Sequence, residues 1–126
     1  MLSFIEHIAI AAADPAALAG WYCEALGFEL LSGSQASRTF FVKLGGGGIL
    51  EILPANDQPR SDREDDDAGI SHIAFAVEDF DATYAALQQK GVRLSPVNAA
   101  PDGKKLAFFT DPEFNQLQLA YRPEPL

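Results

Sequence analysis

Two stretches of the chain share one pattern of apolar and polar positions. Each opens with an apolar run whose third residue is a histidine, Ile5–Ala11 and Ile70–Ala76. Alternation along these runs predicts strands over 4–11 and 70–77, with the histidine and two alanines on one face and larger apolar residues on the other. Each run is followed by an aspartate that can cap a helix, then apolar residues at helical spacing, then a terminating glycine.

The remaining apolar segments predict three further strands in each half. In the first half they cover 28–31, 38–44 and 49–53, and in the second half 92–95, 104–110 and 116–121. Both halves therefore have the order β-α-β-β-β. The spacing from His7 to His72 equals that from Asp14 to Asp79, which indicates an internal duplication. We expect a single α+β domain over 1–126, with one module at 1–55, a linker at 56–68 and a second module at 69–126.

The linker is polar and acidic. It contains the run Glu64-Asp65-Asp66-Asp67 together with one proline and two arginine residues. An acidic run can bind a hard cation, but the spacing is not that of a calcium-binding EF-hand loop. A solvated connector is the favoured interpretation.

Charge and cysteine content exclude several classes of protein. Nine Lys+Arg against eighteen Asp+Glu give a net charge of −9, which argues against a nucleic-acid or anionic-membrane partner. No apolar run approaches the roughly 20 residues of a membrane span, and the N-terminus lacks the basic start of a signal peptide. The single cysteine, Cys23, rules out an intrachain disulfide and suits a reducing compartment. We expect a cytoplasmic protein in which Cys23 is a structural thiol.

Four polar residues occupy repeat-equivalent positions on the predicted strands. His7 and His72 lie in the first strand of each half, and Glu51 and Gln118 lie in the last. Pseudo-twofold pairing of the modules would bring all four to one concave face. A lone strand histidine or glutamate is usually a packed or solvent-facing residue, but this matched set favours a divalent-metal site. Two imidazoles, a carboxylate and an amide oxygen suit Zn, Ni, Co, Fe or Mn, and an octahedral ion would keep two positions open.

The motifs IEHIAIAAAD, ISHIAFAVED and TDPEFNQLQL resemble the vicinal oxygen chelate superfamily, and within it small bacterial glyoxalase I-like proteins most of all. That superfamily includes glyoxalase I, bleomycin-resistance proteins, methylmalonyl-CoA epimerase, fosfomycin-resistance enzymes and extradiol dioxygenases. The resemblance implies two tandem βαβββ modules forming a cupped mixed β-sheet, and a homodimer. It also implies that the metal ligands are His7, Glu51, His72 and Gln118.

Gln118 departs from the family pattern, which usually has glutamate at that position. In glyoxalase-type relatives the final glutamate is both ligand and proton-transfer base, and an amide cannot act as a base. The resemblance to epimerases, which have the mirror arrangement, makes Glu51 the candidate catalytic base. We expect a lyase or isomerase that moves the proton of a small substrate chelating the metal through neighbouring oxygens.

Two other functional classes remain open. One is a metal-free ligand-binding protein similar to bleomycin-resistance proteins, and the other is a dioxygenase or resistance transferase. The missing final glutamate counts against the second class, because it halves the charge that the site offers a metal. Arg38, Arg93 and Lys104 are candidates to bind an anionic part of the substrate, although ordinary surface charge is the favoured interpretation for each alone.

Overall fold

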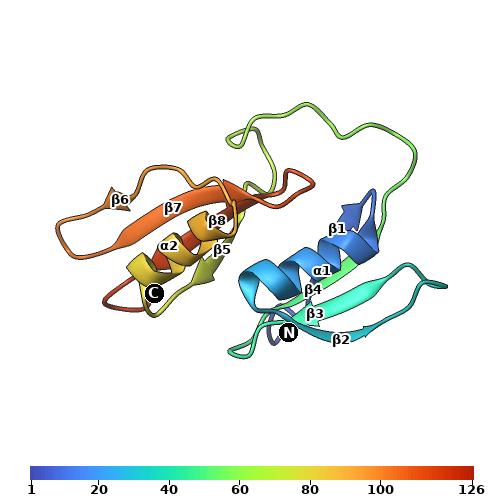
Figure 1. The fold of residues 1–126 in the computed structure, drawn as a ribbon, viewed down its shortest axis with the longest axis horizontal. Coiled ribbons are helices and arrows are strands. Elements are labelled where there is room, and N and C mark those ends of the chain that lie inside the picture. Colours follow the sequence, from blue (N-terminus) through green and yellow to red (C-terminus); the bar gives the residue numbers. More distant parts are fainter. The chain divides into compact units, whose positions relative to one another are not determined.

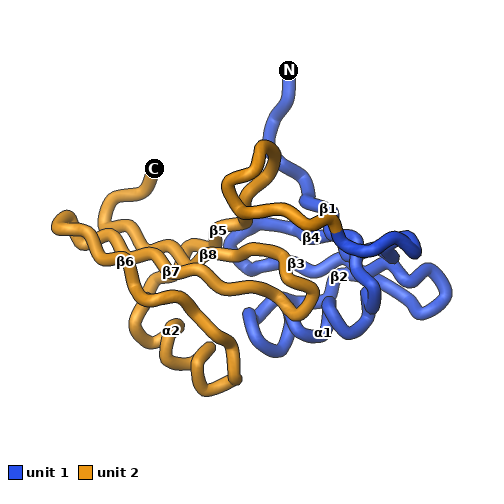
Figure 2. Tube along the Cα trace, turned by 90° about the horizontal axis from the view of Figure 1, so that it is seen from above, with its two compact units in different colours: residues 1–60 blue, residues 61–126 orange.

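The computed structural model describes all 126 residues. The chain forms two compact units, Met1–Arg60 and Ser61–Leu126 (Figure 2). Each unit combines one α-helix with a four-stranded mixed sheet (Figure 1). The α+β class and the β-α-β-β-β order predicted from the sequence are confirmed.

The first unit is built around strand β4. Its elements are β1 (Ile8–Ala12), α1 (Pro15–Leu26), β2 (Glu29–Gly33), β3 (Phe40–Lys43) and β4 (Ile49–Pro54). The strand order is β1-β4-β3-β2. β1 runs parallel to β4 and β3 runs antiparallel to it, so that β4 is hydrogen-bonded on both sides.

The second unit repeats this topology around strand β8. Its elements are β5 (Ile73–Ala76), α2 (Phe80–Gln89), β6 (Asn98–Ala99), β7 (Lys105–Thr110) and β8 (Gln116–Tyr121). The strand order is β5-β8-β7-β6, with β5 parallel to β8 and β7 antiparallel to it. The last strand of each unit thus lies between the first strand and the penultimate strand.

Both helices begin at the predicted aspartates. The Asp14 carboxylate accepts a hydrogen bond from the Ala17 backbone N–H at 3.1 Å, and Asp79 accepts one from Ala82 at 3.0 Å. Each bond satisfies one of the N–H groups that a helix N-terminus leaves without an intrahelical partner. Gly27 ends α1 in the left-handed conformation, with φ 77°, which glycine adopts without a steric penalty.

The two faces of each sheet differ in character. Large apolar side chains occupy the face on which the helix packs, whereas the histidines, Glu51, Gln118 and small alanines belong to the opposite face. This is the alternation that the sequence predicted. The core of the helix-covered faces contains Ile10, Val42, Leu50, Ile52, Phe109, Leu117 and Leu119 from the strands, and Leu18, Tyr22, Phe80 and Leu87 from the helices.

The structure corrects the predicted starts of the two histidine strands. β1 begins at Ile8 and β5 begins at Ile73, so each histidine directly precedes its strand. Ile5 and Ile70, expected inside the strands, are largely exposed.

The predicted strand 92–95 is wrong, and β6 lies further on, at Asn98–Ala99. Ser95 does bond to Phe108 of β7: its N–H donates to the Phe108 carbonyl, and its side-chain Oγ accepts from the Phe108 N–H, both at 2.8 Å. A side-chain oxygen therefore takes the place of a backbone carbonyl. Pro96, which has no N–H to donate, follows immediately.

Strand β2 forms one edge of the first sheet and carries a bulge. Its register against β3 shifts between Leu30 and Ser32, so Leu31 is an extra residue. The predicted strand ended at Leu31, but pairing continues through Gly33, which lies opposite Phe40.

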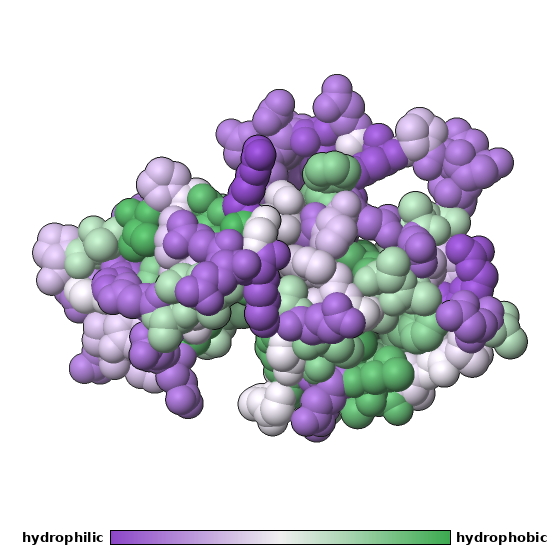
Figure 3. Space-filling model, in the orientation of Figure 1, coloured by the Kyte–Doolittle hydropathy of each residue, from purple (hydrophilic) through white to green (hydrophobic).

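The predicted linker, residues 56–68, is polar and exposed. Figure 3 shows it at the top of the view as a strongly hydrophilic band. Within it, Arg63 donates to the Asp67 carbonyl at 2.9 Å and the Glu64 N–H donates to the Asp67 carboxylate at 2.8 Å. No helix in the structure is long and apolar enough to cross a membrane.

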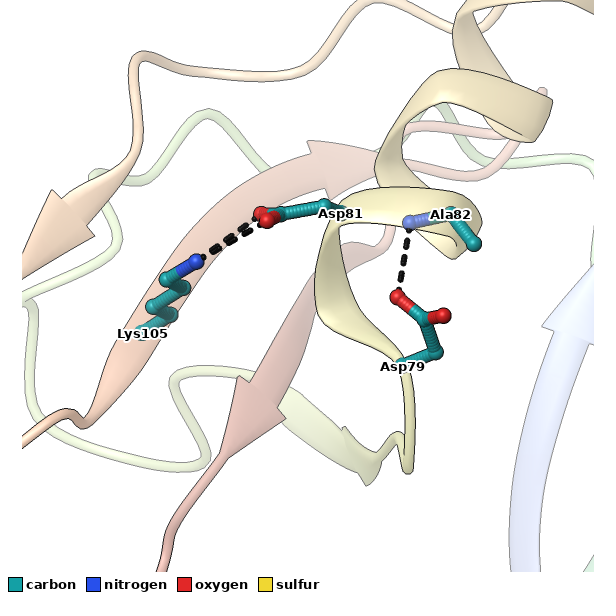
Figure 4. A network of polar contacts seen from close by, with 4 residues as sticks. All are labelled: Asp79, Asp81, Ala82 and Lys105. Carbon is teal, nitrogen blue, oxygen red and sulfur yellow. Dashed lines mark hydrogen bonds and ion pairs between the residues drawn. The ribbon is translucent and has the colours of Figure 1, made fainter.

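The two aspartates at the start of α2 should contribute unequally to stability (Figure 4). Replacing Asp79 by alanine should lower the free energy of unfolding by about 1 kcal/mol, because a helix N–H loses its partner. Asp81 pairs with the Lys105 ammonium at 3.0 Å but is 77% exposed, so Asp81→Asn should cost only about 0.5 kcal/mol or less. Urea unfolding of both variants checks this, and equal losses would contradict the ranking.

Candidate metal centre

A carboxylate lies on each side of the His7 ring. The Glu6 carboxylate lies 3.0 Å from Nδ1, and the Glu51 Oε2 atom lies 3.9 Å from Nε2. A carboxylate only accepts hydrogen bonds, so Nδ1 carries the hydrogen in the contact with Glu6. The Nε2 lone pair is then available for a metal ion, and an outer carboxylate of this kind is a common support for a metal-bound histidine.

Glu51 lies in the middle of β4, opposite Ala9 of β1 and Phe41 of β3. Its side chain is 23% exposed, which leaves the carboxylate partly open to a ligand. Ligand atoms of these types sit about 2.1 Å from a divalent ion, so two of them on one ion are at most about 4.2 Å apart. The 3.9 Å separation between His7 and Glu51 is within that limit. The pair therefore fits one divalent ion.

The second unit repeats the support of the imidazole with a different residue. The Ser71 hydroxyl lies 2.9 Å from Nδ1 of His72, as Glu6 does for His7. In both units the residue directly before the histidine engages Nδ1. A hydroxyl can donate or accept, whereas a carboxylate only accepts, so the two imidazoles differ in the charge beside them.

Gln118 occupies the position in β8 that Glu51 occupies in β4. It lies opposite Ala74 of β5 and Phe108 of β7, and it is 7% exposed. A neutral amide can be buried in this way at a lower free-energy cost than a carboxylate. The site offers one carboxylate rather than two.

A phenylalanine packs against each histidine, a contact that the sequence reasoning missed. The Phe41 ring meets His7 edge-on at a centroid distance of 6.0 Å, and the Phe108 ring meets His72 at 5.1 Å. The available signal was a pair of adjacent phenylalanines in each half, at 40–41 and 108–109. The alternation of side chains along a strand predicts that one phenylalanine of each pair lies on the same face as the histidine. It does not predict that the two rings are in contact.

The four predicted ligands are divided between the two units, two in each. His7 and Glu51 belong to the first unit, and His72 and Gln118 share one face of the second. No group of three or more His, Cys, Asp or Glu side chains gathers around a common point. The union of the two pairs in one site stays a prediction.

The three predicted anion-binding residues lie on connecting segments. Arg38 is exposed and has φ 52° in a turn where its N–H donates to the Ser34 carbonyl. Arg93 is exposed after α2, and half-buried Lys104 directly precedes β7. Their role in binding a substrate stays a prediction.

A partly open cavity of about 580 Å³ lies on the small-residue face of the second unit. Its floor contains Ala74 and Ala76 of β5 and Ala120 of β8, and Arg122 and the C-terminal residues line the rest.

Cys23 takes no part in the candidate centre. Burial raises the pKa of the Cys23 thiol, and the neighbouring Glu24 carboxylate raises it further. Because the thiolate is the reactive form, Cys23 should be labelled by a disulfide reagent at pH 7.5 more slowly in the folded chain than in the chain unfolded in guanidinium. The folded rate should rise with pH. Equal rates in the two states would contradict this.

Comparison with known proteins gives one family. The family model described as the Glyoxalase/Bleomycin resistance protein/Dioxygenase superfamily matches residues 4–119. The uncharacterized protein YaeR of Escherichia coli (strain K12) is 32% identical over 123 residues, which cover 94% of this chain and 95% of YaeR. The uncharacterized protein YwkD of Bacillus subtilis (strain 168) is 30% identical over 124 residues, covering 94% and 97%.

Solved structures show the same fold. A glyoxalase family protein from Enterococcus faecalis is 31% identical, with a TM-score of 0.78 and coverage of 94% of this chain and 98% of that chain. Lactoylglutathione lyase from Agrobacterium tumefaciens is 20% identical over 95% of this chain and 94% of the lyase, with a TM-score of 0.72. The antibiotic binding protein TnmS3 from Streptomyces sp. CB03234 is 23% identical over 95% and 96%, with a TM-score of 0.74. At these identities the last two show a shared fold alone.

Proposed function

Because the chain belongs to the glyoxalase/bleomycin resistance protein/dioxygenase superfamily, we propose that it is a metal-dependent enzyme of the glyoxalase type. The reaction is abstraction and return of the proton next to a carbonyl group, in a small substrate that offers two neighbouring oxygens. An enzyme that catalyses this reaction is a lyase or an isomerase. The fold alone does not determine which reaction is catalysed, since one fold hosts many functions.

The observation that carries the proposal is the geometry around His7. Its Nε2 atom lies 3.9 Å from the Glu51 carboxylate, while its Nδ1 atom is engaged by Glu6. Metal-binding histidines commonly have this arrangement, in which one ring nitrogen is hydrogen-bonded to a carboxylate and the other is available to the ion. His72, with Nδ1 engaged by Ser71, supplies the equivalent donor of the second unit.

The ion would be held by His7, Glu51, His72 and Gln118. The chemistry of these donor atoms suits Zn, Ni, Co, Fe or Mn. When bound, the ion supplies polarisation of the substrate carbonyl and stabilises negative charge on its oxygen. The Glu51 carboxylate accepts the proton from the adjacent carbon and returns it to the substrate. Gln118 holds its position as a neutral donor and takes no proton, because an amide is not a base.

Glu51 should be required for proton exchange. We expect Glu51→Gln to slow exchange of a substrate proton with deuterated water by about a hundredfold or more. The assay follows the hemithioacetal of methylglyoxal and glutathione, and an epimerisable acyl-CoA, by NMR. Glu29→Gln, on the exposed edge strand β2, is the matched control and should leave the rate unchanged. Unchanged exchange in Glu51→Gln would show that another group is the base.

The neutral residue at position 118 should limit metal affinity. Gln118→Glu should raise the affinity for Co²⁺ or Zn²⁺ by about tenfold, because a second carboxylate faces the ion. Without metal the same variant should be less stable than the wild type, since the position is 7% exposed and the new charge is unpaired. Calorimetric titration and thermal unfolding with and without metal measure both effects. A metal affinity equal to that of the wild type would argue against Gln118 as a ligand.

A metal-free ligand-binding protein is the second candidate function. The cavity of about 580 Å³ in the second unit favours it, because cavities of this size bind drug-sized ligands. Elemental analysis of untagged protein separates the two candidates. About one ion per chain supports the enzyme, and its absence together with tight binding of an apolar ligand supports the binding protein.

A homodimer and a cytoplasmic location complete the proposal. Both rest on the family resemblance and on the single cysteine rather than on a contact in the structure. Arg38, Arg93 and Lys104 stay candidates for an anionic group of the substrate.

A further inference from the structure

Phe41 and Phe108 occupy equivalent places in the two units. Phe41 lies in β3 opposite Glu51, and Phe108 lies in β7 opposite Gln118. Their rings meet the histidine rings edge-on, with interplanar angles of 78° for His7 and 90° for His72. The same aromatic contact therefore occurs once for each proposed histidine ligand.

Three positions near each phenylalanine on this face have diverged between the two units, whereas the alanines of β1 and β5 are retained. The equivalent pairs around each phenylalanine are Lys43 and Thr110, Ile49 and Gln116, and Leu53 and Ala120. Their side chains differ in charge, polarity or volume. A general need for cross-strand packing would be met by many apolar residues, so retention of phenylalanine beside the histidine points to a more specific requirement.

The histidines need such a contact because of where they lie. β1 begins at Ile8 and β5 at Ile73, so neither imidazole is on a residue inside a strand. The bond from Nδ1 to the preceding side chain is exposed in both cases, and an exposed hydrogen bond competes with water. An edge-to-face aromatic contact adds a directional restraint on the ring that water does not replace.

We propose that Phe41 and Phe108 are positioning residues that fix the two imidazole rings so that each Nε2 atom faces the metal. The inference rests on the proposed function, because it assigns these contacts to a metal site. Pre-orientation of ligands lowers the conformational entropy lost on binding, and this raises the affinity for the ion.

Adjacent phenylalanines supply matched controls for a metal-binding test. Phe40 and Phe109 neighbour the two positions in sequence but are buried in the helix-covered core. Phe41→Leu and Phe108→Leu should each weaken Co²⁺ binding to the full-length chain by about two- to tenfold. Phe40→Leu and Phe109→Leu should lower the unfolding temperature and leave Co²⁺ affinity within twofold of the wild type. Equal losses in the two sets would overturn the proposal.

A second measurement reads the contact without metal. The chain has only two histidines, so protein labelled with ¹³C-histidine gives two ring signals, assigned by substitution. Phe41→Leu should remove the ring-current shift of His7 and lower the order parameter of its Cε1 carbon, with His72 unchanged. Phe108→Leu should do the reverse, and the control variants should change neither ring.

The two measurements separate failure of the inference from failure of the proposed function. A wild-type chain that binds no Co²⁺ would remove the proposed function, and the order parameters alone would then decide whether the rings are held. Order parameters unchanged in Phe41→Leu and Phe108→Leu would overturn the positioning role, whatever the metal affinity.

Discussion

Parallel pairing of the first and last strand in each unit is the constraint on which the rest of the molecule depends. β1 on β4 sets Ala9 beside Glu51, and β5 on β8 sets Ala74 beside Gln118. Because side chains alternate along a strand, a slip of one residue would turn Glu51 into the helix-covered core. The large apolar residues that alternate with the polar ones prevent this slip, since they would have to leave the core at the same time. Packing of one face thus determines which residues the other face offers.

The two units have kept the same arrangement of strands and histidine contacts, but they differ in charge at the position of Glu51 and Gln118. Both units keep the histidine, an oxygen against Nδ1, and a phenylalanine on the neighbouring strand. Glu51 is a partly open carboxylate, whereas its counterpart Gln118 is buried and neutral. The first unit therefore presents a carboxylate beside its histidine, whereas the equivalent position of the second unit is a neutral amide.

The sequence predicted those features that depend on local chemistry and on repetition. The caps at Asp14 and Asp79, the element order and the division of each sheet into two faces all follow from residue type and period. The strand starts could not be read in this way, because the apolar residues before His7 suit a strand by pattern although the structure leaves them exposed. Strand 92–95 failed for a related reason: Ser95 pairs through its hydroxyl, which no apolar period reveals. Contacts between a histidine and a phenylalanine more than thirty residues away depend on register, which pattern alone leaves open.

The bulge at Leu31 has a consequence for how the chain behaves among its own copies. β2 is an outer strand whose residues are all exposed, including two leucines, and its unpaired backbone groups could accept a strand from another molecule. A residue inserted into the ladder twists the outer rim and breaks its regular spacing of donors and acceptors. A straight incoming strand then cannot match more than a few groups at a time. The bulge therefore disfavours the edge-to-edge strand pairing from which fibres grow. Deleting one residue to restore a regular ladder would remove this protection.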